Sequence, residues 1–504
     1  MENIVIGKHT LESLTSGMYS DPYVVYREYI QNATDSIDDA VRQGLLRSGE
    51  DSINIDINPS ERRISIIDNG CGVPSSLAEK TLISIGNSRK DSSNSRGFRG
   101  IGRLSALSYC SKLTFETSSF SEKLGTRIVI DSKQLSDLLG QSSDEDVSVL
   151  DVLQQVYTCS TYPEKENQHY FRVILDGVDT ASELTNIEEV VSYISQNAPV
   201  PYDRTVFPWG YEITQRIRKE GITIRSYNIS ACCGTLHQQV FKPYKSEFLS
   251  DKGKQIYDKI HDIEIVKFPT SEGAIAAIGW VAKTSFLGSI YDKSIKGLRI
   301  RKGNILIGDG QTLNILFKDP RFNGWSIGEI FAIDPYLIPN ARRDNFEKNA
   351  AYFSLIEQMI PIAAKIAKEI RSASAARNHE LSSALKTLDD VRAQASHALE
   401  SGVKSSQKGS LKDNLTQTQA LLESISTNGD VDSYIQEIAF EELDMLLGRI
   451  KGATTYKALN TLDNLNVTEK HILERVFNIL IASGYSRVDE IIDIILSGFS
   501  SSSS

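Results

Sequence analysis

Short runs of apolar residues bounded by polar ones recur through the first third of the chain. The clearest runs are Ile64–Ile67 and Arg127–Ile130, which have the length and composition of strands. Before them, Ile30, Ala33 and Ile37 follow the three- and four-residue spacing of a helix with one buried face. The pattern of residues 1–150 therefore predicts an α/β domain.

Strand-like runs resume after a polar stretch at residues 141–155. They predict strands at 170–175, 221–225, 273–280 and 298–301, and with them a second α/β domain over 156–345. From Phe346 onward glycine and proline become rare and apolar residues recur at helical spacing. We expect a break at 404–413 and further helices at 415–426, 432–450 and 468–483, so residues 346–504 predict a helical third region in an α+β protein.

Composition narrows the class of protein. At about 150 residues per domain, 504 residues suggest roughly three domains. The formal net charge of -10 disfavours a surface devoted to nucleic acid, although it leaves room for a local basic groove. Five irregularly spaced cysteines exclude a disulfide framework and a C-x-x-C zinc site. Because the chain also lacks a signal-peptide pattern and an apolar run of membrane-spanning length, we expect a soluble cytoplasmic protein without membrane contact.

The first candidate site lies on the predicted helix that contains Ile30. Glu28, Asn32 and Asp35 stand at i, i+4 and i+7 and share one helix face. An amide oxygen such as that of Asn32 is a suitable ligand for Mg²⁺ that also binds phosphates, and a nearby carboxylate can activate water. A solvated helix face is the alternative reading of this trio.

A second candidate site follows the strand Ile64–Ile67. There Asp68 precedes Gly70 and Gly72. A buried carboxylate can accept a hydrogen bond from an exocyclic amine, and glycines let a flat ring approach the backbone, so the pattern indicates an adenine pocket. An ordinary Asp-Asn-Gly turn is the alternative.

A third candidate site is rich in glycine. Gly97, Gly100 and Gly102 open a predicted helix, whose free N–H groups could hold phosphate oxygens. The segment matches neither the P-loop nor the dinucleotide fingerprint. A fourth piece, Gly125-Thr126, opens the strand that contains Arg127 and places a hydroxyl where it could lie beside a base.

In this order the four pieces resemble the GHKL ATPases, which include gyrase, MutL, histidine kinases and the ninety-kilodalton heat-shock chaperones. The resemblance implies a Bergerat-type site for ATP and Mg²⁺, in which Asp68 binds the adenine amine, Asn32 binds the metal and Thr126 lies near Asp68. It implies further that the glycine segment contacts the phosphates and that residues 75–96 form a lid, with 85–90 resembling the lid segment of heat-shock and MORC-type members. The nucleotide-binding residues so implied are Asn32, Asp35, Asp68, Gly70, Gly72, Lys90, Gly97, Gly100, Ile101, Gly102 and Thr126.

Two residues carry the expected hydrolysis. Histidine kinases lack a base equivalent to Glu28, whereas the gyrase, chaperone and MutL-like members keep one, so the resemblance implies an ATPase. Residues 337–344 are similar to the chaperone middle-domain loop, which implies that Arg343 reaches the γ-phosphate and Asn340 braces the loop. Arg342 competes with Arg343 for this role, and a basic surface loop is the alternative for the whole segment.

The resemblance favours an ATP-driven conformational clamp of the heat-shock chaperone kind. It would form a homodimer, close its lid on ATP, and act on a protein client or partner subunits. The alternative is a MORC- or MutL-like nucleic-acid clamp, or a subunit of a bacterial phage-defence system, with a basic lining of Arg299, Arg301, Lys302 and Arg342. A third reading is a kinase or an ATP-binding scaffold without turnover.

Overall fold

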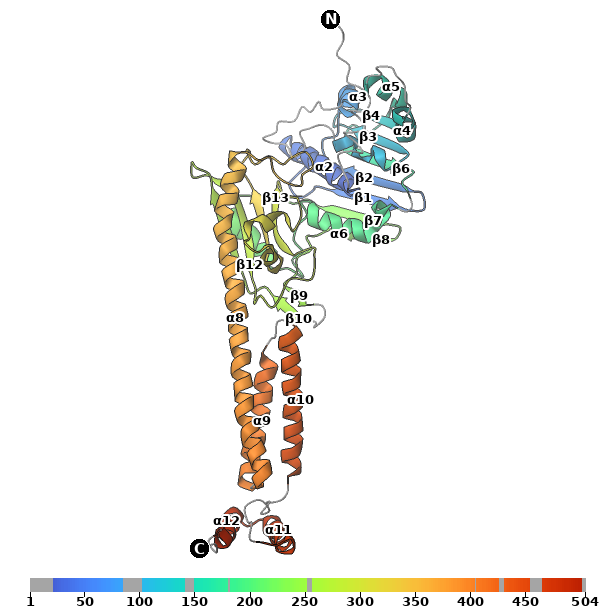
Figure 1. Ribbon diagram of the computed structural model, residues 1–504. Helices are drawn as coiled ribbons and strands as arrows, with labels where there is room; N and C mark the ends of the chain where they lie inside the picture. The colour runs from blue at the N-terminus through green and yellow to red at the C-terminus, as the bar shows by residue number, and fades with distance from the viewer. Residues whose placement is uncertain are drawn as a thin grey trace. The chain divides into compact units, whose positions relative to one another are not determined.

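The computed structural model describes residues 21–84, 102–140, 149–179, 182–251, 256–403, 405–425, 430–453 and 465–500. These residues fall into two compact units, one of residues 1–285 and 289–367 and one of residues 286–288 and 368–504. The first contains an eight-stranded, a five-stranded and a two-stranded sheet with their helices, and the second is helical (Figure 1). The expected fold class, an N-terminal α/β domain followed by a helical C-terminal region, is confirmed.

An eight-stranded sheet dominates the first unit, in the order β5-β4-β3-β6-β2-β1-β7-β8. Neighbouring strands are antiparallel except for β1 and β7, which run parallel. The strands are β1 (Ile53–Asn58), β2 (Arg63–Asp68), β3 (Lys112–Ser118), β4 (Leu124–Asp131), β5 (Tyr157–Pro163), β6 (Tyr170–Asp176), β7 (Ile229–Cys233) and β8 (Leu236–Gln239).

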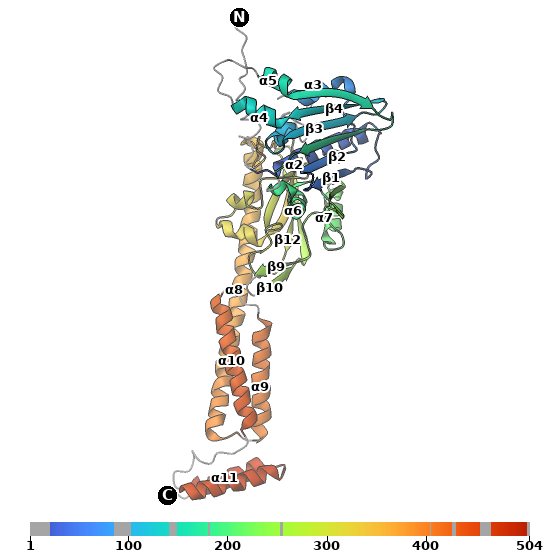
Figure 2. The same ribbon diagram turned by 90° about the vertical axis from the view of Figure 1, so that its right-hand side faces the viewer.

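Side-chain alternation gives this sheet one core face. In β1, Ile53, Ile55 and Ile57 are fully buried, while the residues between them are exposed, as the period of a strand requires. Helix α2 (Val24–Arg42) contributes its apolar face to the same core, and Figure 2 shows it against the sheet. The other helices of this part are α3 (Ser75–Ile83), η1 (Gly102–Ser108), α4 (Ser132–Gly140), α5 (Val149–Val156), η2 (Glu183–Thr185) and α6 (Ile187–Asn197).

The boundary expected near residue 150 falls within this sheet, because β5 to β8 come after it in the chain. The predicted strand at 221–225 is wrong. That segment has no ladder partner, and the Arg225 carbonyl instead accepts a hydrogen bond from the Asn304 side chain at 2.9 Å. A side chain therefore satisfies a backbone group that a neighbouring strand would otherwise satisfy.

The second sheet has the order β11-β12-β15-β13-β14. The strand predicted at 298–301 is present as β13, which lies between β15 and β14 and is therefore paired on both sides. The elements of this part are α7 (Trp209–Lys219), β9 (Glu247–Asp251), β10 (Ile256–Lys259), β11 (Asp262–Pro269), β12 (Ile275–Lys283), β13 (Gly297–Lys302), β14 (Ile305–Ile307), η3 (Thr312–Leu316), η4 (Pro320–Trp325) and β15 (Ile327–Ala332).

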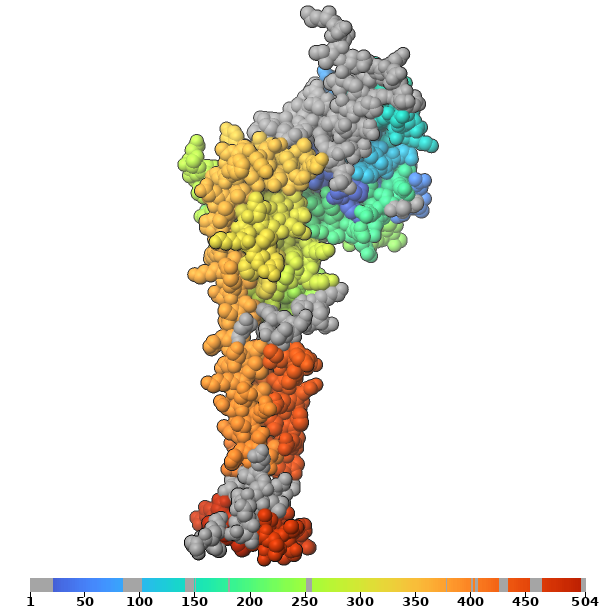
Figure 3. Space-filling model, viewed as in Figure 1, coloured from blue at the N-terminus to red at the C-terminus, as the bar shows by residue number. Residues whose placement is uncertain are grey.

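The second unit contains the C-terminal part of α8 (Ala350–Ser401), together with α9 (Ser405–Ser424), α10 (Asp430–Gly452), α11 (Val467–Ala482) and α12 (Val488–Ser500). Helices α8, α9 and α10 share a core that includes Ala395, Leu415 and Leu443, and their side chains form a continuous surface in Figure 3. The break predicted at 404–413 is wrong. Helix α8 ends at Ser401, Gly402 follows it with a positive φ, and α9 begins at Ser405. Among the described helices, none is long and apolar enough to cross a membrane.

Candidate functional site

Helix α2 carries its acidic residues inward. Glu28 is 7% exposed and Asp35 is 6% exposed, so the solvated helix face considered for this trio is excluded for both carboxylates. Asn32 lies between them and is half-buried, and its side chain makes no hydrogen bond to any described residue. The helix therefore carries two buried carboxylates and a half-buried amide.

Arg343 approaches Glu28 directly. The Arg343 Nε atom lies 3.3 Å from Glu28 Oε1, and the two side chains are 12% and 9% exposed. The Nε atom of Arg27 lies 3.5 Å from the same oxygen, and its Nη2 donates to the carbonyl of Arg342 at 3.2 Å. The Arg342 side chain itself is exposed. Of the two adjacent arginines, only Arg343 has its side chain against the carboxylate.

The loop that carries Arg343 is tightly closed. Its backbone has a φ of 58° at Arg343, in the left-handed region that few non-glycine residues adopt. The Arg343 N–H donates to the Asn340 carbonyl at 3.1 Å, and the Gly308 N–H donates to the Arg343 carbonyl at 2.8 Å. Asn340 also donates from its side chain to Asp344 at 2.6 Å. Surrounding contacts thus hold an unfavourable conformation, as is common at functional sites.

Gly102 lies against the second oxygen, Oε2, of the Glu28 carboxylate. It begins η1, and a Cβ atom built on it would overlap the Glu28 Oε2 atom. The Tyr29 hydroxyl donates to the Arg103 carbonyl at 2.8 Å and fixes η1 against α2. Only glycine therefore allows the start of η1 to lie so close to Glu28.

Asp68 ends β2 on the core face of the sheet and is 5% exposed. Its Oδ1 accepts a hydrogen bond from the Gly70 N–H at 2.8 Å. Gly72 has a φ of 64°, and a Cβ there would overlap the carbonyl of Ser118. The Asp68 turn is thus held close to the end of β3, and glycine is required for that approach.

Thr126 lies in the same row of the sheet as Asp68. The strand register pairs Asp68 with Phe171, Phe171 with Thr117, and Thr117 with Thr126. Directly paired residues point to the same face, so all four side chains face the core side. Thr126 lies three strands away from Asp68, whereas Thr117 lies two strands away. The hydroxyl of Thr117 is therefore the closer of the two to Asp68. Thr117 was not identified from the sequence.

Several buried polar side-chain atoms on α2 and η1 form no hydrogen bond with a described residue, although Glu28 Oε1 lies within ion-pair distance of Arg27 and Arg343. They include the Nε of Arg27, Oε1 of Glu28, both amide atoms of Gln31, the Nε of Arg103 and the Oγ of Ser105. Such atoms are rare in folded proteins, and a polar ligand is one explanation for a group of them. Burial also lowers the pKa of Arg103. Gln31, Arg103 and Ser105 were missed from the sequence, because a single amide, guanidinium or hydroxyl carries no pattern there.

The side chains that carry these atoms, together with Asn32, are of the types that bind a polyphosphate and its cation. Arg27 and Arg103 offer donors, Asn32 offers a neutral oxygen, and Glu28 offers a carboxylate. Within the described ranges, no group of three or more His, Cys, Asp and Glu side chains is arranged to hold a metal ion by itself. That is consistent with magnesium, which keeps several waters and is held through substrate phosphates with one or two protein ligands.

Four of the expected nucleotide-binding residues lie outside the described residues: Lys90, Gly97, Gly100 and Ile101. The same applies to most of the expected lid, of which the described part is α3 and Ser84. In that part, the Arg103 side chain donates to the carbonyl of Ser84, so η1 contacts the residue that follows α3.

Comparison with known proteins agrees with this geometry. Residues 19–148 match the family described as histidine kinase-, DNA gyrase B- and HSP90-like ATPase. The N-terminal part of the chain carries a GHKL-type ATPase domain. The matched range of this GHKL domain contains Glu28, Asn32, Asp35, Asp68, Gly102 and Thr126.

A curated relative extends the comparison to the chaperones. The chain is 27% identical over 134 residues to the chaperone protein HtpG of Halalkalibacterium halodurans. The match covers 23% of this chain and 21% of HtpG, so the chain spans about a fifth of the length of this curated relative. The similarity is therefore to one part of a chaperone.

Proposed function

We propose that this protein binds and hydrolyses ATP, with Glu28 as the general base that activates water. The observation that carries the proposal is the buried Glu28 carboxylate with the Arg343 guanidinium 3.3 Å away, accompanied by buried polar atoms on α2 and η1 that form no hydrogen bond with a described residue. A carboxylate beside a permanently charged guanidinium suits a reaction in which water attacks a phosphoryl group and negative charge develops on its oxygens.

The remaining residues would bind the nucleotide. Asp68 would accept a hydrogen bond from the adenine amine, with Gly70 and Gly72 letting the ring approach, while Asn32 would be the protein ligand of Mg²⁺. Bound there, the cation would offset phosphate charge. Asp35 would support Asn32 from the next turn of α2, and Thr126 would line the core side of the base pocket. Lys90, Gly97, Gly100, Ile101 and Gly102 would contact the phosphates.

Arg343 would stabilise the charge that develops on the γ-phosphate. Its side chain is directed at Glu28, whereas that of Arg342 is exposed, which supports Arg343 as the acting residue. Arg27 would hold the loop, because it donates to the Arg342 carbonyl. The retained carboxylate at Glu28 also supports hydrolysis over phosphotransfer to a histidine.

The conformational part of the proposal is a homodimeric clamp in which ATP closes the lid and a protein client or partner subunit is acted upon. The α11–α12 pair supports dimerisation, since its buried core consists of Phe477, Val488 and Ile492 alone among the described residues. Its exposed apolar side chains include Val467 at 85%, Ile479 at 64% and Ile494 at 69%. A second copy would cover such a surface.

The nucleic-acid clamp is less well supported. Two of the four residues expected to line it, Arg299 and Arg301, are 2% and 0% exposed, and Lys302 donates to backbone carbonyls of residues 333 and 334. Buried cations bonded to protein groups cannot bind phosphates of a duplex. The basic lining is therefore wrong for Arg299 and Arg301, because β13 lies inside its sheet.

Phosphate release from ATP and Mg²⁺, compared between the wild-type chain and Glu28→Gln, tests the proposal. We expect turnover by the wild type alone and equal nucleotide binding by both. Molecular mass in solution, with and without a non-hydrolysable ATP analogue, tests the clamp. Turnover by Glu28→Gln at the wild-type rate would exclude Glu28 as the base, and a monomer in both conditions would exclude the dimeric clamp.

A further inference from the structure

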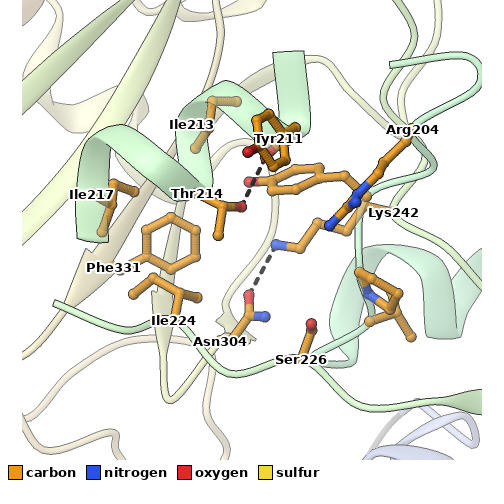
Figure 4. A pocket seen from close by; sticks show the side chains of 14 residues that line it. Arg204, Tyr211, Ile213, Thr214, Ile217, Ile224, Ser226, Lys242, Asn304 and Phe331 are labelled. Atoms are coloured by element: carbon orange, nitrogen blue, oxygen red, sulfur yellow. Dashed lines mark hydrogen bonds between the residues drawn. The ribbon is translucent and has the colours of Figure 1, made fainter. Parts of the chain in front are cut away.

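A cavity of about 120 Å³ lies beside α7 in the first unit, away from the GHKL site (Figure 4). Its apolar wall is formed by Ile213 and Ile217 of α7, Ile224 and Phe331. Charged and polar side chains also line it, including Arg204, Lys242 and Asn304. A cavity of about 150 Å³ can hold a benzene ring, so this one has room for a compact group of similar size.

Lys242 is the buried cation of the cavity. It is 4% exposed, and its Nζ donates to Asn304 Oδ1 at 2.9 Å and to the two carboxylate oxygens of Glu329 at 2.8 and 2.9 Å. The two oxygens of a carboxylate can accept two separate N–H groups, so these three acceptors match the three ammonium protons. Lys242 therefore contributes its positive charge, and no free N–H donor, to the cavity that its side chain lines.

The charge around Lys242 is unbalanced. Arg299 and Arg301 are also buried, and Glu329 is the one carboxylate among the described residues that forms an ion pair with any of these three cations. Burial, with a further contribution from Arg301, lowers the pKa of Lys242 to about 7. Excess positive charge in the interior is costly, and a bound anion would relieve it.

Arg204 provides a second cation at the exposed side of the cavity. Its guanidinium lies 5.3 Å from the ring centroid of Tyr211, and it forms no ion pair with any carboxylate of the described residues. Figure 4 shows Arg204 and Lys242 reaching toward the same space. A guanidinium in this position can bind a carboxylate through paired N–H donors.

We propose that this cavity is a binding site for a small organic carboxylate with a compact apolar tail. The carboxylate is bound by Arg204 and attracted by the nearby charge of Lys242, and the tail packs against Ile213, Ile217 and Phe331. A cation is excluded by the excess positive charge, and an uncharged analogue loses both the ionic contact with Arg204 and the attraction of Lys242. The site is independent of the proposed ATPase activity.

The test is calorimetry on the full chain without nucleotide, with benzoate and its uncharged isostere benzamide as probes. We expect benzoate to bind at least about tenfold more tightly than benzamide, as for a hydrogen bond to a charged group. Equal affinities, or no benzoate binding at millimolar concentration, would overturn the proposal.

Three variants locate the binding. Arg204→Gln is expected to weaken benzoate about tenfold, whereas Arg218→Gln, an exposed arginine of α7 outside the cavity, should leave it unchanged. Thr214→Leu enlarges a cavity-lining side chain on α7 and should abolish binding of both probes. These positions lie outside the buried charge network, so folding is retained. Benzoate binding that survives both Arg204→Gln and Thr214→Leu would overturn the assignment.

Discussion

The Nε atom of Arg343 lies 3.3 Å from the Oε1 atom of Glu28, and both side chains are almost fully buried. One residue comes from the GHKL domain and the other from a closed loop near the end of the first unit. Their contact brings the proposed base and the proposed phosphate-binding cation together.

Replacing Glu28 with glutamine should abolish most of the turnover without loss of nucleotide binding. Removing a general base costs about 10²- to 10⁴-fold in rate, whereas the amide keeps the volume of the buried side chain. Steady-state phosphate release and nucleotide titration measure the two effects. Glu61→Gln, at an exposed carboxylate of the β1–β2 turn, is the control that should behave as wild type.

Arg343→Ala and Arg342→Ala form a matched pair. Loss of a cation that stabilises developing charge should lower the rate about 10²- to 10³-fold for Arg343→Ala. Arg342→Ala should stay near the wild-type rate, because the Arg27 contact uses the backbone carbonyl of that residue. Single-turnover phosphate release distinguishes them, and the opposite result would assign the role to Arg342.

Asp68→Asn should weaken ATP binding. A hydrogen bond to a charged group is worth about 1.5–3 kcal/mol, which corresponds to a loss of about ten- to a hundredfold in affinity. Asp56→Asn, at an exposed carboxylate on β1, is the control. An unchanged dissociation constant for Asp68→Asn would remove Asp68 from the adenine pocket.

Gly102→Ala should impair turnover although no charge is altered. The added methyl group would overlap the Glu28 carboxylate, so either η1 or the carboxylate must shift. Gly409→Ala provides the contrast, because a Cβ at that position in α9 meets nothing within 4 Å. It should raise stability by up to about 1 kcal/mol through its helix preference and leave the rate unchanged. Parallel thermal unfolding and rate measurements separate the two effects.

The second sheet should lose stability in acid through Glu329. Burial alone would raise the pKa of this carboxyl, but Arg301 and Lys242 lower it to about 2. Because the folded value lies below the unfolded value of about 4.3, the stabilisation is complete above that pH and is lost as the pH falls toward 2. The lowered pKa of Glu329 therefore contributes about 3 kcal/mol to the free energy of unfolding at neutral pH.

Tryptophan fluorescence can follow this acid transition, since Trp280 donates to Tyr202 at 3.0 Å and the Tyr202 hydroxyl donates to Glu329 at 2.5 Å. Denaturant unfolding at pH 6 and pH 3 gives the free energies. In Glu329→Gln the buried cations lose their partner, so we expect about 3–5 kcal/mol less stability at pH 6 and a smaller change between the two pH values. An equal pH dependence in both proteins would contradict the assignment.

The sequence predicted the parts of the site that depend on local spacing. The helix that carries Glu28, Asn32 and Asp35 and the turn after Asp68 follow from periodicity and from glycine placement, and both are present. The approach of Arg343 to Glu28 could not be derived from local pattern, because it depends on how the closed loop packs on α2. Only the resemblance to a family pointed to that residue.

Local pattern was misleading where charge is buried. Arg299 and Arg301 alternate with apolar residues and were expected to line a basic groove in the alternative nucleic-acid clamp. In the structure they lie on β13, where Arg299 is in register with Glu329 of the parallel strand β15, and Arg301 pairs with the Glu329 carboxylate. A carboxylate distant in sequence therefore decides whether these arginines are inside or outside.

The order of the eight-stranded sheet has a practical consequence for anyone who wishes to study the GHKL domain alone. Strand β6 lies between β3 and β2 and comes after residue 150 in the chain, as does β7, the parallel neighbour of β1. A recombinant fragment cut at residue 150 would lack an interior strand and would leave unpaired backbone on both sides of the gap. Residues up to at least the end of β8 must be retained for a faithful isolated nucleotide-binding fragment.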